Sequence, residues 1–209
     1  MLEPKRDIHS SKDLGSLTIP ARLSEQFRIL FTGTLDAGKT TIAELFVNRP
    51  DVHVVREVAR DLLSSNPALE SHPNLQFKII DEQIKRELIA ERSLKPFVIL
   101  DRSYLDVICY SRYFGHSIDE AALIKQLNYD KVLLFSPYDI DVTSTLSTEM
   151  QNYRTSIHEM FIRVLEELAM PYEIVSGDVQ RRLSRIQDIL ISANIGKVAS
   201  STTGDSPAS

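Results

Sequence analysis

The stretch FRILFTGTLDAGKTT, residues Phe27–Thr41, decides the fold of this 209-residue chain. It opens with a run of apolar residues typical of a buried strand, and a helical pattern, TTIAELFVN, begins at Thr40. Between the two, Gly33, Gly38, Lys39 and Thr40 satisfy the pattern G-x-x-x-x-G-K-[ST]. A strand, this loop and a helix in direct succession predict a loop that binds phosphate groups.

Each position of this loop has a chemical reason. The glycines let the backbone curl around a phosphate with its N–H groups pointing inward, and the following helix adds its positive N-terminal end. Lys39 brings a compact charge to the β and γ phosphates of a nucleotide, and the Thr40 hydroxyl suits Mg²⁺. We therefore expect ATP and Mg²⁺ to be bound by Gly33, Thr34, Leu35, Asp36, Ala37, Gly38, Lys39, Thr40 and Thr41.

Asp36 is the unusual residue of the loop, because an acid beside phosphates is electrostatically unfavourable. The sequence leaves two interpretations open. Asp36 is either an exposed loop acid, or it points toward an acceptor or a cation.

The rest of the chain alternates short apolar runs with longer stretches of helical period. The strand-like runs are residues 27–33, 52–57, 96–102, 131–137 and 172–177. Apolar residues recur every three or four positions over 77–88 and 150–168, as in helices that cover a sheet. The pattern predicts an α/β fold of the P-loop NTPase class, a doubly wound, mainly parallel five-stranded sheet with helices on both faces. Ligands of such folds bind beyond the carboxyl ends of the strands.

Two of these strand ends carry charged residues. The second strand leads into Glu57, which could hold or accept the proton of a substrate hydroxyl; the alternative is an ion pair with Arg56 or Arg60 at a solvated helix start. The third strand ends in Asp101 and Arg102, and such an acid reaches Mg²⁺ directly or through water. We therefore predict catalytic roles for Lys39, Glu57, Asp101 and Arg102, and Mg²⁺ binding by Thr40 and Asp101.

A polar segment at residues 136–160 follows the fourth strand and leads into a long amphipathic helix. Segments in this place often close over the phosphates and supply an arginine to the transition state, and Arg154 is the only arginine present. We predict a catalytic role for Arg154, with a solvent-facing side chain as the alternative. Gln83 is a candidate for reading a base, the alternative being an exposed helical glutamine. Near Gly177, Arg181 or Arg182 could stack on the adenine ring.

Composition narrows the class of protein. A formal net charge of -5 argues against a nucleic-acid binder, which needs a clustered basic face. The chain has no apolar run of about 18 residues that would span a membrane. Cys109 is the single cysteine and is expected to be a small buried hydrophobic residue. We expect a cytoplasmic monomer or homodimer whose partner is a small molecule.

Three regions are expected along the chain. Residues 1–25 are polar and without periodicity, which predicts a mobile N-terminal arm. Residues 26–195 form the P-loop NTPase or kinase domain. Residues 196–209 are small and polar, which predicts a disordered C-terminal tail.

Four segments, GTLDAGKTT, REVARDLL, LDRSYLDVICYSRYFG and YEIVSGDVQRRLSRI, resemble in order and spacing the NadR-like AAA-type ATP-binding domains, which include the ribosylnicotinamide kinase domain of NadR proteins. The resemblance covers about residues 27 to 190. The chain is also similar to the deoxynucleoside kinases, which have an acid after the second strand and an acid-arginine-serine triplet after the third. The resemblance implies that Gly33 to Thr41 bind ATP and Mg²⁺, that Glu57 faces the substrate hydroxyl, and that Asp101 and Arg102 form the third-strand pair.

These features together favour a kinase that moves the γ-phosphoryl group of ATP to a hydroxyl of a nucleoside-like acceptor, a nucleoside or nicotinamide riboside. The polar segment departs from the nucleoside-kinase pattern, because an arginine-rich stretch is expected and Arg154 stands alone. An ATP- or GTP-dependent regulatory switch, or an NTP hydrolase acting through a protein partner, is therefore the alternative.

Overall fold

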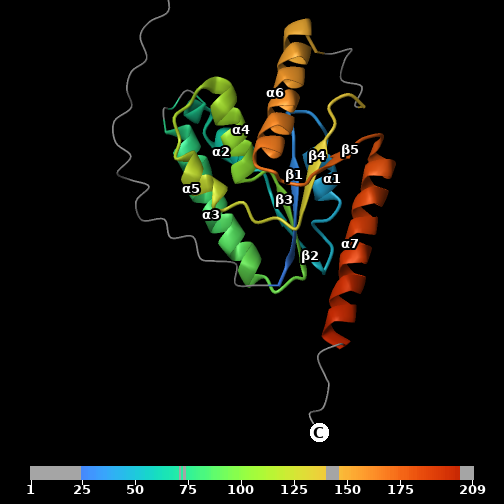
Figure 1. The fold of residues 1–209 in the computed structure, drawn as a ribbon. Coiled ribbons are helices and arrows are strands. Elements are labelled where there is room, and N and C mark those ends of the chain that lie inside the picture. Colours follow the sequence, from blue (N-terminus) through green and yellow to red (C-terminus); the bar gives the residue numbers. More distant parts are fainter. Residues whose placement is uncertain (1–24, 71, 73, 140–145, 203–209) are drawn as a thin grey trace, which may run out of the picture.

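The computed structural model describes residues 25–70, 72, 74–139 and 146–202, with side chains up to residue 195. A parallel sheet forms the centre of this part of the chain (Figure 1). Its five strands lie in the order β2-β3-β1-β4-β5, and every neighbouring pair is parallel. The strands are β1 (Phe27–Thr32), β2 (Val52–Val55), β3 (Phe97–Asp101), β4 (Lys131–Phe135) and β5 (Glu173–Val175). The predicted doubly wound P-loop NTPase fold is confirmed.

Helices connect the strands and cover both faces of the sheet (Figure 1). The helices α3, α4 and α6 pack against one face, and α1 and α7 pack against the other. The helical elements are α1 (Lys39–Glu44), α2 (Val58–Ser65), the 3₁₀ turn η1 (Pro67–Leu69), α3 (Leu75–Arg92), α4 (Tyr104–Phe114), α5 (Glu120–Ile124), α6 (Thr148–Glu167) and α7 (Val179–Thr202).

The core explains why the strands are apolar throughout. Leu30 of β1 and Leu134 of β4 point to the cluster that includes α3, α4 and α6, whereas their neighbours Phe31 and Phe135 point to the cluster with α1 and α7. Alternate residues of a strand point to opposite faces, so a sheet covered on both faces needs apolar side chains at both. Cys109 of α4 is buried in the first cluster as expected, and burial raises the pKa of its thiol.

The strand order brings three strand ends together. In the register of the sheet, Phe31 of β1 lies opposite both Asp101 of β3 and Leu133 of β4. The loop after β1 therefore leaves the sheet between the ends of β3 and β4. The connections from β1 and from β4 run to opposite sides of the sheet, which is the place where open α/β sheets bind ligands.

The boundaries of the ordered region differ partly from expectation. The helix α7 continues to Thr202 and includes the first seven positions of the segment 196–209, for which a disordered tail was predicted. Lengthening a formed helix fixes one residue for each added hydrogen bond, so a small polar stretch can extend it at little cost. Residues 203–209 and residues 1–24 of the predicted N-terminal arm lie outside the described part of the chain.

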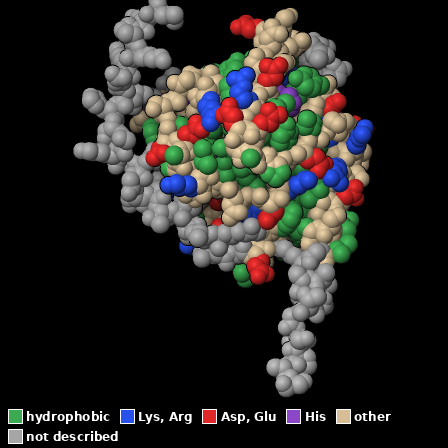
Figure 2. All heavy atoms as spheres, in the orientation of Figure 1, with side chains coloured by type: hydrophobic (Ala, Val, Ile, Leu, Met, Phe, Trp, Pro, Cys, Tyr) green, Lys and Arg blue, Asp and Glu red, His purple; other side chains and the backbone are tan. Residues whose placement is uncertain are grey.

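Surface charge on the visible face is mixed. Figure 2 shows Lys and Arg side chains interspersed with Asp and Glu, with no single basic field on that face. This distribution agrees with the small negative net charge. Within the described residues, no helix has the length and apolarity that crossing a membrane requires.

Candidate active site

The loop between β1 and α1 has the backbone conformation that a phosphate cradle requires. Gly33 and Gly38 have φ angles of 126° and 78°, in the region that favours glycine. A side chain at Gly33 would also place its Cβ 3.0 Å from the carbonyl oxygen of Phe135. Both glycines are therefore needed for the chain to turn at this point.

Lys39 is folded back onto this loop. Its buried ammonium group donates hydrogen bonds to the carbonyl oxygens of Gly33 at 2.9 Å and Thr34 at 2.6 Å. Burial lowers the pKa of Lys39 to about 7, and the nearby positive charge of Arg102 acts in the same direction. A triphosphate would favour the charged form of this side chain.

Asp36 sits at the tip of the loop with a φ of 52°, a conformation that aspartate tolerates better than most residues. Its side chain is exposed, as is that of Thr41. This exposure agrees with the loop-acid interpretation, but Asp36 also lines the cavity in front of the loop, so its direction toward an acceptor or a cation stays a prediction.

Thr40 and Asp101 meet at the end of β3. The Thr40 hydroxyl donates a hydrogen bond of 2.6 Å to Asp101 Oδ2, while Asp101 Oδ1 is buried and has no hydrogen-bond partner. Burial raises the pKa of the Asp101 carboxyl, and the hydrogen bond from Thr40 opposes this shift. A buried carboxylate oxygen with a free lone pair beside a threonine hydroxyl fits a hard divalent cation such as Mg²⁺. The described residues contain no cluster of three or more His, Cys, Asp or Glu suited to a metal, so the remaining ligands would be phosphate oxygens and water.

Glu57 lies at the start of α2, opposite the loop. Its Oε1 is 2.8 Å from Arg102 Nε, and its Oε2 is 3.1 Å from Arg60 Nη2. Oε2 is buried and has no hydrogen bond, because the Arg60 contact lacks hydrogen-bond geometry. The alternative interpretation, pairing with Arg60, is thus observed, but within a cluster that also contains Arg102 rather than on a solvated helix start.

Arg102 is the centre of this cluster. Its φ of 72° is unusual for a residue with a side chain, and such backbone conformations concentrate at functional sites. The guanidinium Nη1 donates to Asp106 Oδ1 at 2.9 Å, to the Gly33 carbonyl at 3.2 Å and to the Tyr110 hydroxyl at 3.3 Å. Arg102 therefore connects the acid of α2 with the loop. Asp106 follows it by four residues, a helical spacing that could have suggested this contact from the sequence.

One cavity joins the loop to this cluster. It has a volume of about 600 Å³ and is lined by residues 35–42, by Glu57, Arg60 and Arg102 on one side, and by Asp139, Gly177, Asp178, Val179 and Arg182 on the other. The structure thus brings the predicted residues of three strand ends to one space. The turn at Gly177 lies at the side where a base was expected.

Arg154 and Arg182 both bond to the backbone of the loop. Arg154 is buried, so the solvent-facing alternative is wrong, and it is absent from the cavity lining. Its guanidinium donates to the carbonyls of Leu35, Asp36 and Pro137 at 3.3, 3.2 and 3.0 Å. A role of Arg154 in the transition state stays a prediction and would require it to leave these carbonyls.

Arg182 has a similar set of partners. It is 2% exposed and donates to the carbonyls of Ala37 at 2.6 Å, Gly177 at 2.7 Å and Ser136 at 3.1 Å. Sequence reasoning assigned it only a possible stacking contact with adenine. The sequence shows only that residue 182 is an arginine, and nothing in it indicates that the guanidinium bonds to backbone carbonyls.

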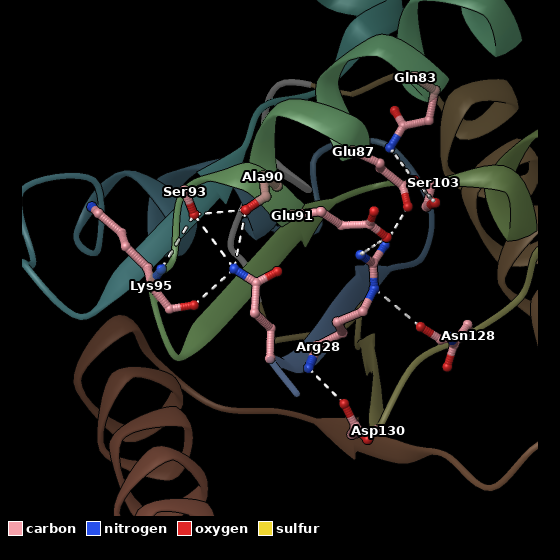
Figure 3. A network of polar contacts seen from close by, with 11 residues as sticks. Arg28, Gln83, Glu87, Ala90, Glu91, Ser93, Lys95, Ser103, Asn128 and Asp130 are labelled. Atoms are coloured by element: carbon pink, nitrogen blue, oxygen red, sulfur yellow. Dashed lines mark hydrogen bonds and ion pairs between the residues drawn. The ribbon is translucent and has the colours of Figure 1, made fainter. Parts of the chain in front are cut away.

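Gln83 lies away from the cavity, in the polar network of Figure 3. It is buried on α3 and donates to Glu87 Oε1 at 2.8 Å, so neither the base-reading nor the exposed interpretation holds. The same oxygen accepts a 2.7 Å hydrogen bond from the Ser103 hydroxyl, and Glu87 also pairs with Arg28 of β1. This network supports the turn that contains Arg102 from the side of α3.

The fold and the loop define a protein with a P-loop NTPase domain. Residues 28–182 match the protein-family model described as an AAA domain, and the match covers well over half of the chain. The chain therefore belongs to this AAA domain family. No curated protein sequence gives a significant match.

Solved structures with the same fold include a NadR protein and two kinases of nucleosides or nucleotides. The predicted resemblance to NadR-like domains and nucleoside kinases is confirmed. The NadR protein in complex with NR has a TM-score of 0.61 and 17% identity, over 78% of this chain and 49% of that one. Thymidylate kinase from Ehrlichia chaffeensis has a TM-score of 0.56 and 21% identity, over 79% and 98%. Deoxyadenosine kinase from M. mycoides with bound dATP has a TM-score of 0.57 and 17% identity, over 79% and 99%. The chain spans about half the length of the NadR protein, and at these identities the likeness establishes the fold.

Proposed function

We propose that this protein is a kinase that transfers the γ-phosphoryl group of ATP to a hydroxyl of a nucleoside-like acceptor, either a nucleoside or nicotinamide riboside. The observation that carries the proposal is the single cavity in which residues 35–42 face Glu57 and Arg102. A phosphate cradle and a carboxylate across one space are the two parts that in-line phosphoryl transfer needs.

The cradle would hold the donor. The backbone N–H groups of the loop and the first turn of α1 would bind the phosphates, and Lys39 would exchange its two carbonyl partners for phosphate oxygens. Thr40 and Asp101 are the residues that would hold Mg²⁺, which when bound neutralises charge on the phosphates. The exposed side of Gly177 and Val179 is left for the base.

Glu57 would act on the acceptor. As the acceptor oxygen bonds to the γ-phosphorus, the bond from that phosphorus to the bridging oxygen of ADP breaks, and the hydroxyl proton passes to the Glu57 carboxylate. The Oε2 of Glu57 is buried and receives no hydrogen bond, with Arg60 Nη2 as its ion-pair partner at 3.1 Å, and it is the oxygen that we assign to this proton. Arg102 and Arg60 would fix the direction of the carboxylate.

The comparisons support the class of acceptor. One similar structure is of a NadR protein in complex with NR, and another is a deoxyadenosine kinase. With a mixed surface charge and a site sized for a small ligand, we propose a cytoplasmic monomer or homodimer whose partner is a free small molecule.

The test is acceptor-dependent turnover. Purified protein is incubated with ATP labelled in the γ position, Mg²⁺ and single nucleosides, including nicotinamide riboside. We expect label to appear in one phosphorylated acceptor, with ADP release that depends on that acceptor. Release of ADP and phosphate without acceptor would instead indicate a hydrolase. Tight nucleotide binding without turnover would contradict the kinase and favour the regulatory switch.

A further inference from the structure

Two buried arginines are bonded to one short piece of the phosphate loop. Arg154 donates to the carbonyls of Leu35 and Asp36, and Arg182 donates to that of Ala37. Three consecutive loop carbonyls therefore each have an arginine partner. The two arginines come from α6 and α7, more than 115 residues further along the chain.

The same two side chains also bind the chain that leaves β4. Arg182 donates to the Ser136 carbonyl and Arg154 to that of Pro137, the next residue. The loop after β1 and the loop after β4 are thus joined through two guanidinium groups. Because a guanidinium has five N–H donors in a rigid planar fork, it can bind several carbonyls at fixed directions in a way that an ammonium cannot.

Because the peptide bond is planar, these carbonyl contacts determine the direction in which the N–H groups of the loop point. In a trans peptide the C=O of one residue and the N–H of the next point in opposite directions, and the described residues contain no cis bond. Holding the carbonyls of Leu35, Asp36 and Ala37 toward the arginines therefore directs the N–H groups of Asp36, Ala37 and Gly38 to the opposite side. That side is where the loop must present its N–H groups to phosphate.

Each arginine is itself fixed in place. Arg182 is 3.6 Å from Asp139, lies over the ring of Phe135 at 5.6 Å and bonds to the Gly177 carbonyl. Arg154 is 4% exposed within the packed face of α6. Neither guanidinium is needed elsewhere in the function proposed above. Their common effect is on the backbone of the loop.

We propose that Arg154 and Arg182 are positioning residues that set the phosphate-binding conformation of the loop through its carbonyl groups, so that triphosphate affinity depends on two side chains bonded to the loop backbone rather than to the phosphates. This inference deepens the proposed function by assigning a determinant of nucleotide binding. It rests on the assignment of the cradle and does not require an acceptor or turnover.

The test compares Arg154→Lys and Arg182→Lys with matched controls at exposed arginines, Arg163→Lys on α6 and Arg185→Lys on α7. All four substitutions keep the positive charge. A loss of affinity that occurs only in the first two therefore comes from the hydrogen bonds that arginine makes to the loop carbonyls and lysine cannot reproduce. The affinities for inorganic tripolyphosphate, ATP and adenosine are measured by calorimetry or by competition, and folding is checked by circular dichroism and thermal melting.

We expect each buried variant to bind tripolyphosphate and ATP about tenfold or more weakly, with adenosine affinity within twofold and both controls unchanged. The double variant should lose less than the product of the two single losses, because both arginines hold one segment. A folded Arg154→Lys or Arg182→Lys that keeps full tripolyphosphate affinity overturns the proposal. An equal loss for adenosine, which signals general damage to the site, overturns it too. If one of the two buried variants fails to fold, the affinities of the other test the proposal by the same criteria.

Discussion

The two walls of the cavity are built in different ways. On the wall of the loop, a polar side chain bonds to the backbone: Lys39 donates to the carbonyls of Gly33 and Thr34. On the opposite wall, Glu57 and Arg102 pair side chain to side chain, and Arg102 makes one longer hydrogen bond of 3.2 Å to the Gly33 carbonyl. A backbone-bonded wall keeps its shape before a ligand arrives, whereas an ion pair between side chains can exchange one partner for a substrate group. We infer that the first wall governs nucleotide affinity and the second governs turnover.

Glu57→Gln gives the largest expected effect and separates the two walls most sharply. The amide keeps the shape of the side chain but cannot take the acceptor proton, so turnover should fall by about 10²- to 10⁴-fold. ATP affinity should change by less than about twofold, because the carboxylate is assigned to the acceptor and its ion pairs are with Arg102 and Arg60, not with the loop. Steady-state kinetics and calorimetry measure the two quantities. Equal losses in both would mean that Glu57 is a structural acid and that the walls are not separable.

Lys39→Ala is the corresponding change on the other wall. It removes a charged hydrogen-bond donor from the phosphates, and ATP affinity should fall by about 100-fold while the domain stays folded. Calorimetry with ATP and a thermal melt of the variant provide the readouts. Unchanged affinity in a folded variant would refute the cradle.

The charge of Lys39 also predicts a pH effect. Its pKa of about 7 in the free protein lies below the usual value, so the side chain is charged below pH 7 and loses its proton above it. Bound phosphate favours the charged form, so binding at pH 8 should take up a proton and be about tenfold weaker than at pH 6. Calorimetry in buffers of different ionisation enthalpy detects this uptake with ATP in the presence of Mg²⁺. Lys39→Ala serves as the control and should take up none; equal uptake in that variant would assign the proton to another group.

The smallest effect is expected for a substitution outside the cavity, at Glu173, and it concerns stability rather than binding or turnover. Glu173 of β5 pairs with Lys131 at 2.8 Å and with Arg185, and these partners lower its pKa to about 2. A carboxylate whose pKa is depressed on folding stabilises the protein above its unfolded value, and that stability is lost as the pH falls toward 2. Glu173→Gln should lower the free energy of unfolding by about 1 kcal/mol or less at pH 7, with no difference near pH 2. Denaturant unfolding at both pH values checks this, and ATP affinity should be unaffected.

The sequence could predict the phosphate loop and the acid after β3 because the residues that form them lie close together in the chain. Gly33, Gly38 and Lys39 lie within one strand-loop-helix unit, and Asp101 directly follows a buried strand. A short pattern therefore carries both the conformation and the chemistry.

The contacts of the loop with residues far along the chain could not be predicted in this way. Arg182 reaches Ala37 only after α7 has packed on the sheet, across a separation of 145 residues. Gln83 resembles an exposed helical residue until Glu87 and Ser103 are known to surround it. The helix α7 extends into the segment 196–209, predicted as a disordered tail, because helix extension depends on what precedes a polar stretch as well as on its composition.

The burial of Cys109 makes the protein convenient for site-specific labelling. It is the only cysteine of the chain, and its thiol is buried with a raised pKa, so it reacts slowly with alkylating reagents. A single cysteine introduced at Tyr138, which is 63% exposed between β4 and α6, would be the reactive thiol without any prior removal of a native one. Its labelling rate with and without ATP would report directly whether nucleotide binding changes the accessibility of the chain after β4.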